Sequence, residues 1–241
     1  RYDLTKFKHG LEELNITLTD EQIEQFLQYY EMLVEKNKVM NLTGITEYEE
    51  VIQKHFLDSL SLIRVIPDIA SQKLTVIDLG TGAGFPGIPL KIAFPELEIT
   101  LMDSLNKRIL FLQEVIDALG LKKVSAVHGR AEEMASNATH RQQYDLCVSR
   151  AVSNLAVLTE YCLPFVKKGG LFVSYKSADS DAEIQEGKKA ISILGGKLTS
   201  VDKFQLPDSD LRRALVCIKK VKDTPKKYPR KAGTPAKLPL K

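Results

Sequence analysis

Apolar residues in the first 65 positions recur three and four residues apart, which is the spacing of an amphipathic helix. One such stripe covers residues 4–14. A second helix begins after Thr19, which forms a predicted capping box with Gln22, and a third covers residues 47–64 until Pro67 ends it. This region shows none of the two-residue alternation of a strand. It is therefore predicted to be a helical layer that packs on another part of the chain.

From residue 74 onward, short apolar runs alternate with helical stretches. The predicted strands cover residues 74–79, 97–103, 123–128, 144–149, 170–175, 197–204 and 212–220, and the predicted helices cover residues 86–94, 106–119, 154–166 and 179–194. Alternation at this spacing is typical of βαβ units in a parallel sheet. The last two strands follow each other with no helix between them, so they form a terminal antiparallel hairpin. The pattern predicts an α/β fold with a mixed, Rossmann-like, seven-stranded sheet.

The composition is that of an ordinary globular protein. The chain has 241 residues, of which 44% are hydrophobic and 27% charged, and it contains no apolar run long enough to cross a bilayer. Its three cysteines are widely spaced and its four histidines form no ligand-spaced pair, so we expect neither disulfides nor a metal site. We expect a cytoplasmic monomer that associates with no membrane.

Charge is distributed unevenly along the chain. The net charge of +3 combines +8 over residues 219–241 with −5 over the rest. The predicted organisation is a helical extension over residues 1–66, a ligand-binding domain over residues 67–222 and a basic, proline-rich tail over residues 223–241. We expect the tail to be extended or flexible and to contact a polyanion through Lys226, Lys227, Arg230 and Lys231, with Tyr228 packing on the body or stacking on a base.

The first strand-to-helix junction carries the glycine-rich segment DLGTGAGFPG at residues 78–87. Glycines there let the chain turn tightly and let a ligand approach the backbone. The spacing also fits a dinucleotide turn, but three features favour S-adenosylmethionine (AdoMet) over NAD: Asp78 before Gly80 and Gly82, the proline at position 86, and the terminal hairpin. Asp103 ends the second strand, where an acid accepts hydrogen bonds from ribose hydroxyls.

Several motifs together resemble one family. They are GTGAGFPGIPL at residues 80–90, DSLNKR at 103–108, GRAE at 129–132, SRAV at 149–152 and PKKYPR at 225–230, with NLT at 41–43 and HFLDSL at 55–60. This set is similar to the bacterial 16S ribosomal RNA guanine-N7 methyltransferases, the glucose-inhibited division protein B family.

The resemblance covers nearly the whole chain. It implies a class I AdoMet-dependent methyltransferase fold and a guanosine substrate in the helix 18 loop of 16S rRNA, free or in the small ribosomal subunit, with no DNA partner. It also implies cofactor contacts at Gly80, Phe85, Ala131, Glu132 and Arg150. Asn41 and His55, which lie in family-like segments, are expected near the pocket.

Every predicted parallel strand after the first is followed by a cation. Arg108, Arg130, Arg150 and Lys176 take these places, and the carboxyl ends of parallel strands form the ligand-binding edge of such a sheet. This pattern suggests an anionic substrate wider than the cofactor. Arg108, Arg130 and Lys176 are therefore predicted to contact RNA.

Motifs that the sequence lacks reduce the number of possible methylation reactions. The loop after the fourth strand lacks the Asn/Asp-Pro-Pro-aromatic sequence common in exocyclic amine methylation, and Cys147 and Cys162 are expected in the core. Guanine N7 carries a free lone pair, so its methylation needs alignment and no general base. We therefore predict no catalytic acid–base residue, and we take His55 and His128 as structural. A small-molecule methyltransferase is the alternative; an NAD-dependent oxidoreductase or a non-catalytic RNA binder comes third.

Overall fold

The computed structural model describes residues 1–241 as one α/β unit. Seven strands form a single sheet in the order β3-β2-β1-β4-β5-β7-β6. The strands are β1 (Thr75–Leu79), β2 (Glu98–Asp103), β3 (Val124–His128), β4 (Tyr144–Ser149), β5 (Val166–Ser177), β6 (Gly196–Gln205) and β7 (Arg212–Lys220). The first five pair in parallel, and β7 is antiparallel to both β5 and β6. The predicted mixed sheet with a terminal antiparallel hairpin is confirmed.

The helices also follow the predicted pattern. They are α1 (Thr5–Glu13), α2 (Asp20–Asn37), α3 (Tyr48–Val51), α4 (Asp58–Leu60), α5 (Gly87–Ala93), α6 (Asn106–Leu119), α7 (Ala131–Met134), α8 (Leu155–Cys162), α9 (Asp181–Ile193) and α10 (Thr234–Lys237). The predicted capping box at the start of α2 is present, with Thr19 Oγ1 accepting from Gln22 N and Gln22 Oε1 accepting from Thr19 N. The short helices α7 and α10 were not predicted, because one helical turn leaves too little periodicity to detect.

The predicted third helix contains a π-helical turn. It begins as α3, widens over Ile52–Leu57, continues as α4 and ends in a 3₁₀ turn over Ser61–Arg64. All residues from 55 to 60 are buried, which an ordinary amphipathic helix does not allow. A π turn of this kind inserts an extra residue and often lies at a functional site.

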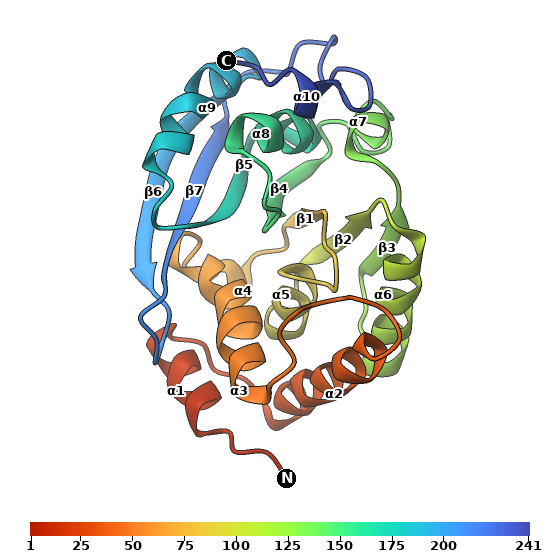
Figure 1. Cartoon of the computed structure of the whole chain (residues 1–241), viewed down its shortest axis with the longest axis vertical. Helices are drawn as coiled ribbons and strands as arrows, with labels where there is room; N and C mark the ends of the chain where they lie inside the picture. Colours follow the sequence, from red (N-terminus) through yellow and green to blue (C-terminus); the bar gives the residue numbers. More distant parts are fainter.

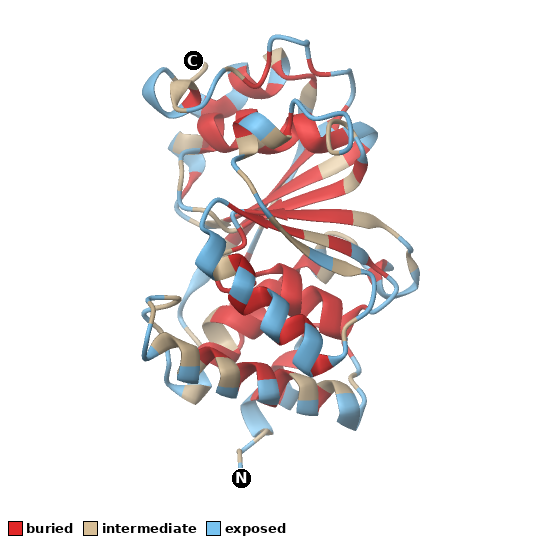
Figure 2. Cartoon of the chain, turned by 90° about the vertical axis from the view of Figure 1, so that its right-hand side faces the viewer, coloured by how far each residue is buried: buried red, intermediate tan, exposed pale blue.

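Helices cover both faces of the sheet (Figures 1 and 2). On one face, α1, α2 and the α3–α4 segment pack with α5 and α6 around a cluster of 40 buried residues. On the other face, α8, α9 and part of the tail enclose a smaller cluster of 21. The N-terminal helices thus share their core with the sheet. No helix has both the length and the apolarity that a membrane crossing requires.

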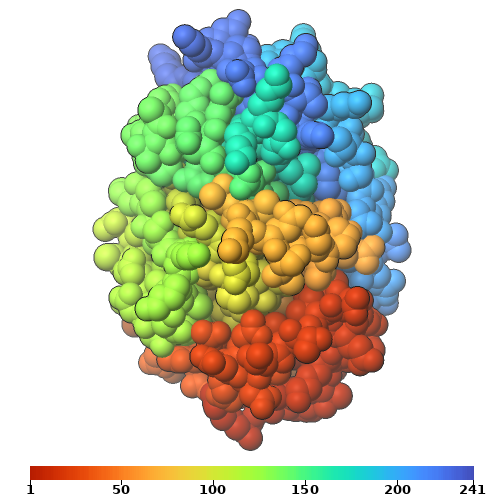
Figure 3. Space-filling view, turned by 180° about the vertical axis from the view of Figure 1, so that it is seen from behind, coloured from red at the N-terminus to blue at the C-terminus, as the bar shows by residue number.

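The basic tail is not extended or flexible, and that prediction is wrong. Tyr228 is 8% exposed and Thr224 is 4% exposed. Arg141 donates to the carbonyl oxygens of Thr224 and Tyr228, at 3.1 and 2.7 Å, and so binds the tail to the body. The space-filling view places this segment at one end of the molecule and the N-terminal helices at the opposite end (Figure 3). Packing of Tyr228 on the body was one of its two expected roles, but charge and proline content could not show that backbone groups of the tail also find partners there.

Candidate functional site

A cavity of about 480 Å³ opens at the carboxyl ends of β1 to β4. This is the edge at which open α/β sheets bind ligands. Of the residues predicted to bind the cofactor, five line it: Gly80, Asp103, Ala131, Glu132 and Arg150. The other three, Asp78, Gly82 and Phe85, lie in the glycine-rich turn beside the cavity. We call this space the cofactor cavity.

Two carboxylates hold the glycine-rich turn in shape. Asp78 Oδ2, at the end of β1, accepts from Thr81 Oγ1 at 2.7 Å and from Gly87 N at 2.8 Å. Asp103 Oδ2, at the end of β2, accepts from Gly82 N at 2.9 Å. Asp103 also lines the cavity, and its carboxylate can accept further hydrogen bonds there. The turn is thus ordered before any ligand arrives.

Asp78 itself is sealed from solvent. It is 0% exposed, and burial raises its pKa to about 7, although the hydrogen bonds from Thr81 and Gly87 oppose the shift. Its role is therefore to hold the shape of the turn, and it does not face the cavity directly. The turn packs closely against helix α2 at Gly84, which has a φ of +109°. A side chain at this position would come 2.6 Å from Tyr29 Oη.

The N-terminal helices reach the cofactor cavity through Arg150. Its guanidinium donates to Ser59 Oγ at 3.3 Å and pairs with the Asp58 carboxylate at 3.3 Å. It also donates to His55 Nδ1 at 3.1 Å and lies 5.5 Å from the centre of the Phe85 ring. Because arginine has no acceptor, His55 Nδ1 must carry the lone pair. Three residues of one helical segment therefore orient the Arg150 side chain.

His55 is a neutral imidazole. Its Nε2 lies 2.8 Å from Thr43 Oγ1, and its ring stacks on Phe85 at 4.3 Å between centroids. With Nδ1 accepting from Arg150, Nε2 holds the proton and donates to Thr43. Burial and the neighbouring Arg150 charge lower the pKa of His55 to about 3. Asn41, also expected near the pocket, is exposed and lines none of the main cavities.

The tail reaches the opposite wall of the cofactor cavity. Glu132 Oε2 accepts from Gly233 N at 2.9 Å, and Glu132 is only 7% exposed. Further along the tail, Arg230 forms an ion pair with the fully buried Glu160 of α8 at 2.7 Å. Arg230 was predicted to contact RNA, but this ion pair occupies its guanidinium within the fold.

A second cavity, of about 360 Å³, adjoins the first. The loop after β4 separates them, since Arg150, Ala151 and Val152 line both spaces. Val152 is fully exposed on this ridge. The residues on the far side come from the α3–α4 segment, β5, β7 and α9, and they include Asp58, Lys176, Glu183 and Arg213. Sequence reasoning missed Asp58, Glu183 and Arg213, because no local motif marks residues brought together from such distant positions.

The other predicted RNA-contacting cations differ in their availability. Arg130 has a 54% exposed side chain and lies 3.5 Å from Glu132, while Arg108 is 32% exposed and lies 3.5 Å from Asp103. Lys226 and Lys227 are exposed on the tail. Lys176 is different, since its side chain is 7% exposed and pairs with Glu183 at 2.7 Å. Its ammonium can reach a ligand only inside the second cavity.

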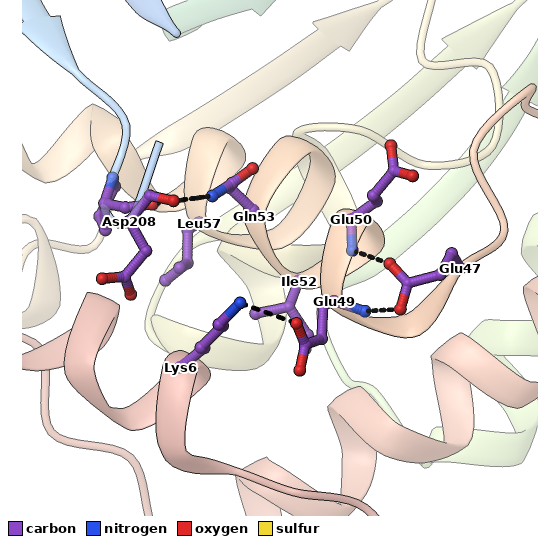
Figure 4. Close-up of a pocket in the computed structure, with 9 residues that line it drawn as sticks. Lys6, Glu47, Glu49, Glu50, Ile52, Gln53, Leu57 and Asp208 are labelled. Atoms are coloured by element: carbon purple, nitrogen blue, oxygen red, sulfur yellow. Dashed lines mark hydrogen bonds and ion pairs between the residues drawn. The ribbon is translucent and has the colours of Figure 1, made fainter. Parts of the chain in front are cut away.

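A third cavity, of about 200 Å³, is lined by the acidic start of α3 and the turn between β6 and β7 (Figure 4). Its polar groups already have partners. Glu47 accepts from the backbone N–H groups of Glu49 and Glu50, and Lys6 pairs with Glu49 at 2.8 Å. Gln53 donates to the carbonyl oxygen of Asp208. These contacts fasten the turn to the helical layer and form no ligand site.

The strand order, the ordered glycine turn and the acid at the end of β2 define a class I methyltransferase, a class that takes its methyl group from AdoMet. The solved structure of M. jannaschii TYW2 in complex with AdoMet shares this fold. It is 14% identical, with a TM-score of 0.51 over 67% of this chain and 74% of that one.

Sequence comparison assigns the chain to one family within this class. The family model for the rRNA small subunit methyltransferase G (GidB) matches residues 22–216. The ribosomal RNA small subunit methyltransferase G of Lachnoclostridium phytofermentans is 57% identical over 99% of this chain and 98% of its own length. That of Alkaliphilus metalliredigens is 54% identical over 97% of each. The chain belongs to this family, so the predicted resemblance is confirmed.

Proposed function

We propose that this chain transfers a methyl group from AdoMet to N7 of a guanosine in 16S rRNA, in the helix 18 loop. Membership of the small-subunit rRNA methyltransferase G family supports the RNA substrate. The arrangement of the site supports N7 as the acceptor atom. In the reaction the N7 lone pair forms the bond to the methyl carbon while the carbon–sulfur bond breaks. The positive charge passes from sulfur to the guanine ring.

The single observation that carries the N7 assignment is the state of three titratable groups near the two cavities, namely two histidines and the acid that shapes the glycine-rich turn. His55 is neutral and both of its ring nitrogens are engaged, and Asp78 is sealed behind the turn. His128 Nε2 lies 3.0 Å from the Ser104 carbonyl. None of these three groups is placed to take a proton from a substrate, and the two carboxylates of the second cavity, Asp58 and Glu183, are each ion-paired with a cation. Guanine N7 has no proton to remove, so in-line placement is the main requirement of this reaction.

The cysteines argue against the main competing base chemistry. Methylation at C5 of a pyrimidine requires a thiolate that attacks the ring, but all three cysteines are buried. Burial raises the pKa of the Cys147 and Cys217 thiols, so they remain protonated. A small-molecule substrate is the alternative, and the exposed cations Arg130, Lys226 and Lys227 favour RNA over it.

The residues around the cofactor cavity fit AdoMet. The backbone of Gly80 and Gly82 leaves room beside the turn, and Asp103 Oδ2, which accepts only from Gly82 N, can accept from a ribose hydroxyl. Ala131, Glu132 and Arg150 form the other walls, with Phe85 packed against Arg150. Asp78 contributes by holding the turn. We propose that these eight residues form the AdoMet site, and that Arg108 and Arg130 at its mouth contact the RNA backbone.

The test is labelled methyl transfer from AdoMet to deproteinised 16S rRNA and to intact small subunits, followed by identification of the methylated nucleoside. The proposal predicts 7-methylguanosine as the product. Any other methylated nucleoside would refute the acceptor atom, and transfer to neither RNA form would refute the substrate.

A further inference from the structure

The second cavity has the chemical character of a nucleobase site. It lies at the carboxyl ends of β4 and β5, directly across the Arg150–Val152 ridge from the cofactor cavity. An acceptor atom must meet the transferred methyl group from outside the cofactor cavity, and this space adjoins it. An enzyme that modifies a base also takes that base out of its stack into a pocket.

The polar groups of this cavity include both donors and acceptors, and they are not equally available. Asp58 is 6% exposed in its side chain and lies between two guanidiniums, 3.3 Å from Arg150 and 3.4 Å from Arg213. Glu183 is 25% exposed in its side chain, and its ion-pair partner is Lys176 at 2.7 Å. Because Glu183 Oε2 is buried against Lys176, Glu183 Oε1 is the carboxylate oxygen that a ligand in the cavity can reach.

Lys176 is held in place by the loop after β4. Its Nζ donates to the Ser153 carbonyl at 2.6 Å as well as pairing with Glu183. An ammonium group has three protons, so one remains for a ligand. The pair thus presents a donor and an acceptor side by side, fixed by β5, α9 and the loop after β4.

We propose that the second cavity binds the guanine base and that Lys176 and Glu183 read its six-membered ring. This inference rests on the proposed function. Guanine carries O6 as an acceptor and N1–H and N2–H₂ as donors on that ring, while N7 lies on the five-membered ring. Glu183 Oε1, which has two lone pairs, accepts from N1–H and N2–H₂, and Lys176 donates to O6. N7 then faces the cofactor cavity.

The pair also selects against other purines. Adenine presents an unprotonated N1 and an amine at C6, so it would place acceptor against carboxylate and donor against ammonium. Hypoxanthine keeps O6 and N1–H but lacks the amine at C2, so it loses one of the two hydrogen bonds to Glu183. A base contact of this kind is worth about a factor of ten or more in discrimination.

The chain offers a matched control for the removal of one carboxylate charge. Asp181, two residues before Glu183 in α9, forms an ion pair with Lys203 at 2.8 Å, and its side chain is 78% exposed. Asp181→Asn and Glu183→Gln therefore each neutralise an acid in the first turn of the same helix. Only Glu183 faces the second cavity.

The experiment measures the affinities of GMP, IMP and AMP for the full-length protein saturated with S-adenosylhomocysteine. We expect the wild-type protein and Asp181→Asn to bind GMP roughly tenfold more tightly than IMP, and AMP most weakly. Glu183→Gln should lose the preference and most methyl transfer to 16S rRNA, with unchanged S-adenosylhomocysteine affinity. A wild-type protein without the GMP preference, or a Glu183→Gln variant that keeps it, would overturn the inference.

A charge-swapped variant separates base reading from a purely structural ion pair. Lys176→Glu/Glu183→Lys restores the attraction but exchanges the donor and acceptor. We expect it to remain folded, with a melting temperature lowered by the loss of the hydrogen bond from Lys176 to the Ser153 carbonyl, and to show neither GMP preference nor methyl transfer. Recovered transfer would contradict the inference. If only the inference is wrong, the wild-type protein still transfers a methyl group to N7 of guanosine. If the proposed function is wrong, it does not, so the two failures are distinguishable.

Discussion

The two ends of the chain each hold one charged residue of the cofactor cavity, by different means. The N-terminal helices hold Arg150 through His55, Asp58 and Ser59, inside a large shared core. The tail holds Glu132 through a single backbone N–H, that of Gly233, and is itself fastened by the Glu160–Arg230 ion pair. The first end therefore depends on packing and a neutral histidine, whereas the second depends on a few polar contacts.

The largest expected effect is on the tail. Arg230→Ala leaves the fully buried Glu160 carboxylate without its cationic partner and with only the backbone N–H of residue 230, which should lower the free energy of unfolding by about 3 to 5 kcal/mol. Lys227→Ala, an exposed neighbour on the same segment, should change it by less than about 0.5 kcal/mol. Urea denaturation measures both. Equal effects would mean that the ion pair does not fasten the tail.

Ligand binding should stabilise the fold by a similar amount. S-adenosylhomocysteine at 100 times its dissociation constant should add about 2.7 kcal/mol, and NAD should add nothing. Gly80→Val should abolish this gain, because its side chain enters the space beside the turn. Gly120→Val is the matched control, since Gly120 also has a positive φ, +64° against +70°, but lies away from the cavity. Thermal shifts retained by Gly80→Val would show that the ligand binds elsewhere.

The N-terminal network should respond to acid. The folded pKa of His55 is about 3, below its ordinary value of 6.5, so the unfolded chain binds the proton first. The contribution of the neutral His55 to the free energy of unfolding is complete above pH 6.5 and is lost as the pH falls toward 3. Between pH 7 and pH 5 the free energy of unfolding should fall by about 2 kcal/mol for this reason.

His55→Gln should remove this part of the pH dependence, as followed by urea denaturation at several pH values. His140→Gln serves as the control, because His140 lies outside the network and contacts Tyr144. A His55→Gln variant with the wild-type pH dependence would rule out the neutral, buried histidine.

The smallest effect concerns the exposed surface of the tail. Replacing Lys226 and Lys227 together by alanine should flatten the slope of log RNA affinity against log salt by about 1.5, because each phosphate that a lysine neutralises adds roughly 0.7 to 0.9 to that slope. Replacing the exposed Lys8 and Lys38 at the other end of the molecule should leave the slope unchanged. If the two double variants behave alike, the tail does not bind RNA.

Sequence periodicity predicted the fold well where burial follows local spacing. Helix α6 and strands β4 and β7 have the predicted bounds, because apolar runs there are bounded by clear turn residues. The π turn at Ile52–Leu57 escaped prediction, since an inserted residue leaves the composition of the helix unchanged. The packed tail escaped it because a few long-range contacts outweigh the charge that dominates its sequence.

The candidate site likewise has a part that the sequence could predict and a part that it could not. In the cofactor cavity, the residues of the glycine-rich turn and Asp103 could be named from their position at the ends of the first two strands. Ala131, Glu132 and Arg150, which line the same cavity, were named from the family resemblance. The second cavity joins Asp58, Lys176, Glu183 and Arg213 from four separate elements. Only Lys176 could be anticipated, because it follows the predicted strand at residues 170–175. Asp58 and Arg213 enter through the packing of the α3–α4 segment and the antiparallel return of β7, and Glu183 enters from α9.

The most direct test of the account is the affinity of S-adenosylhomocysteine for His55→Gln, measured by titration calorimetry at pH 7.5. If the N-terminal helices orient Arg150 for the cofactor, the variant should bind about tenfold more weakly, equivalent to about 1.4 kcal/mol, while His140→Gln binds like the wild type. Wild-type affinity in a folded His55→Gln variant would contradict the claim that the helical layer completes the cofactor site.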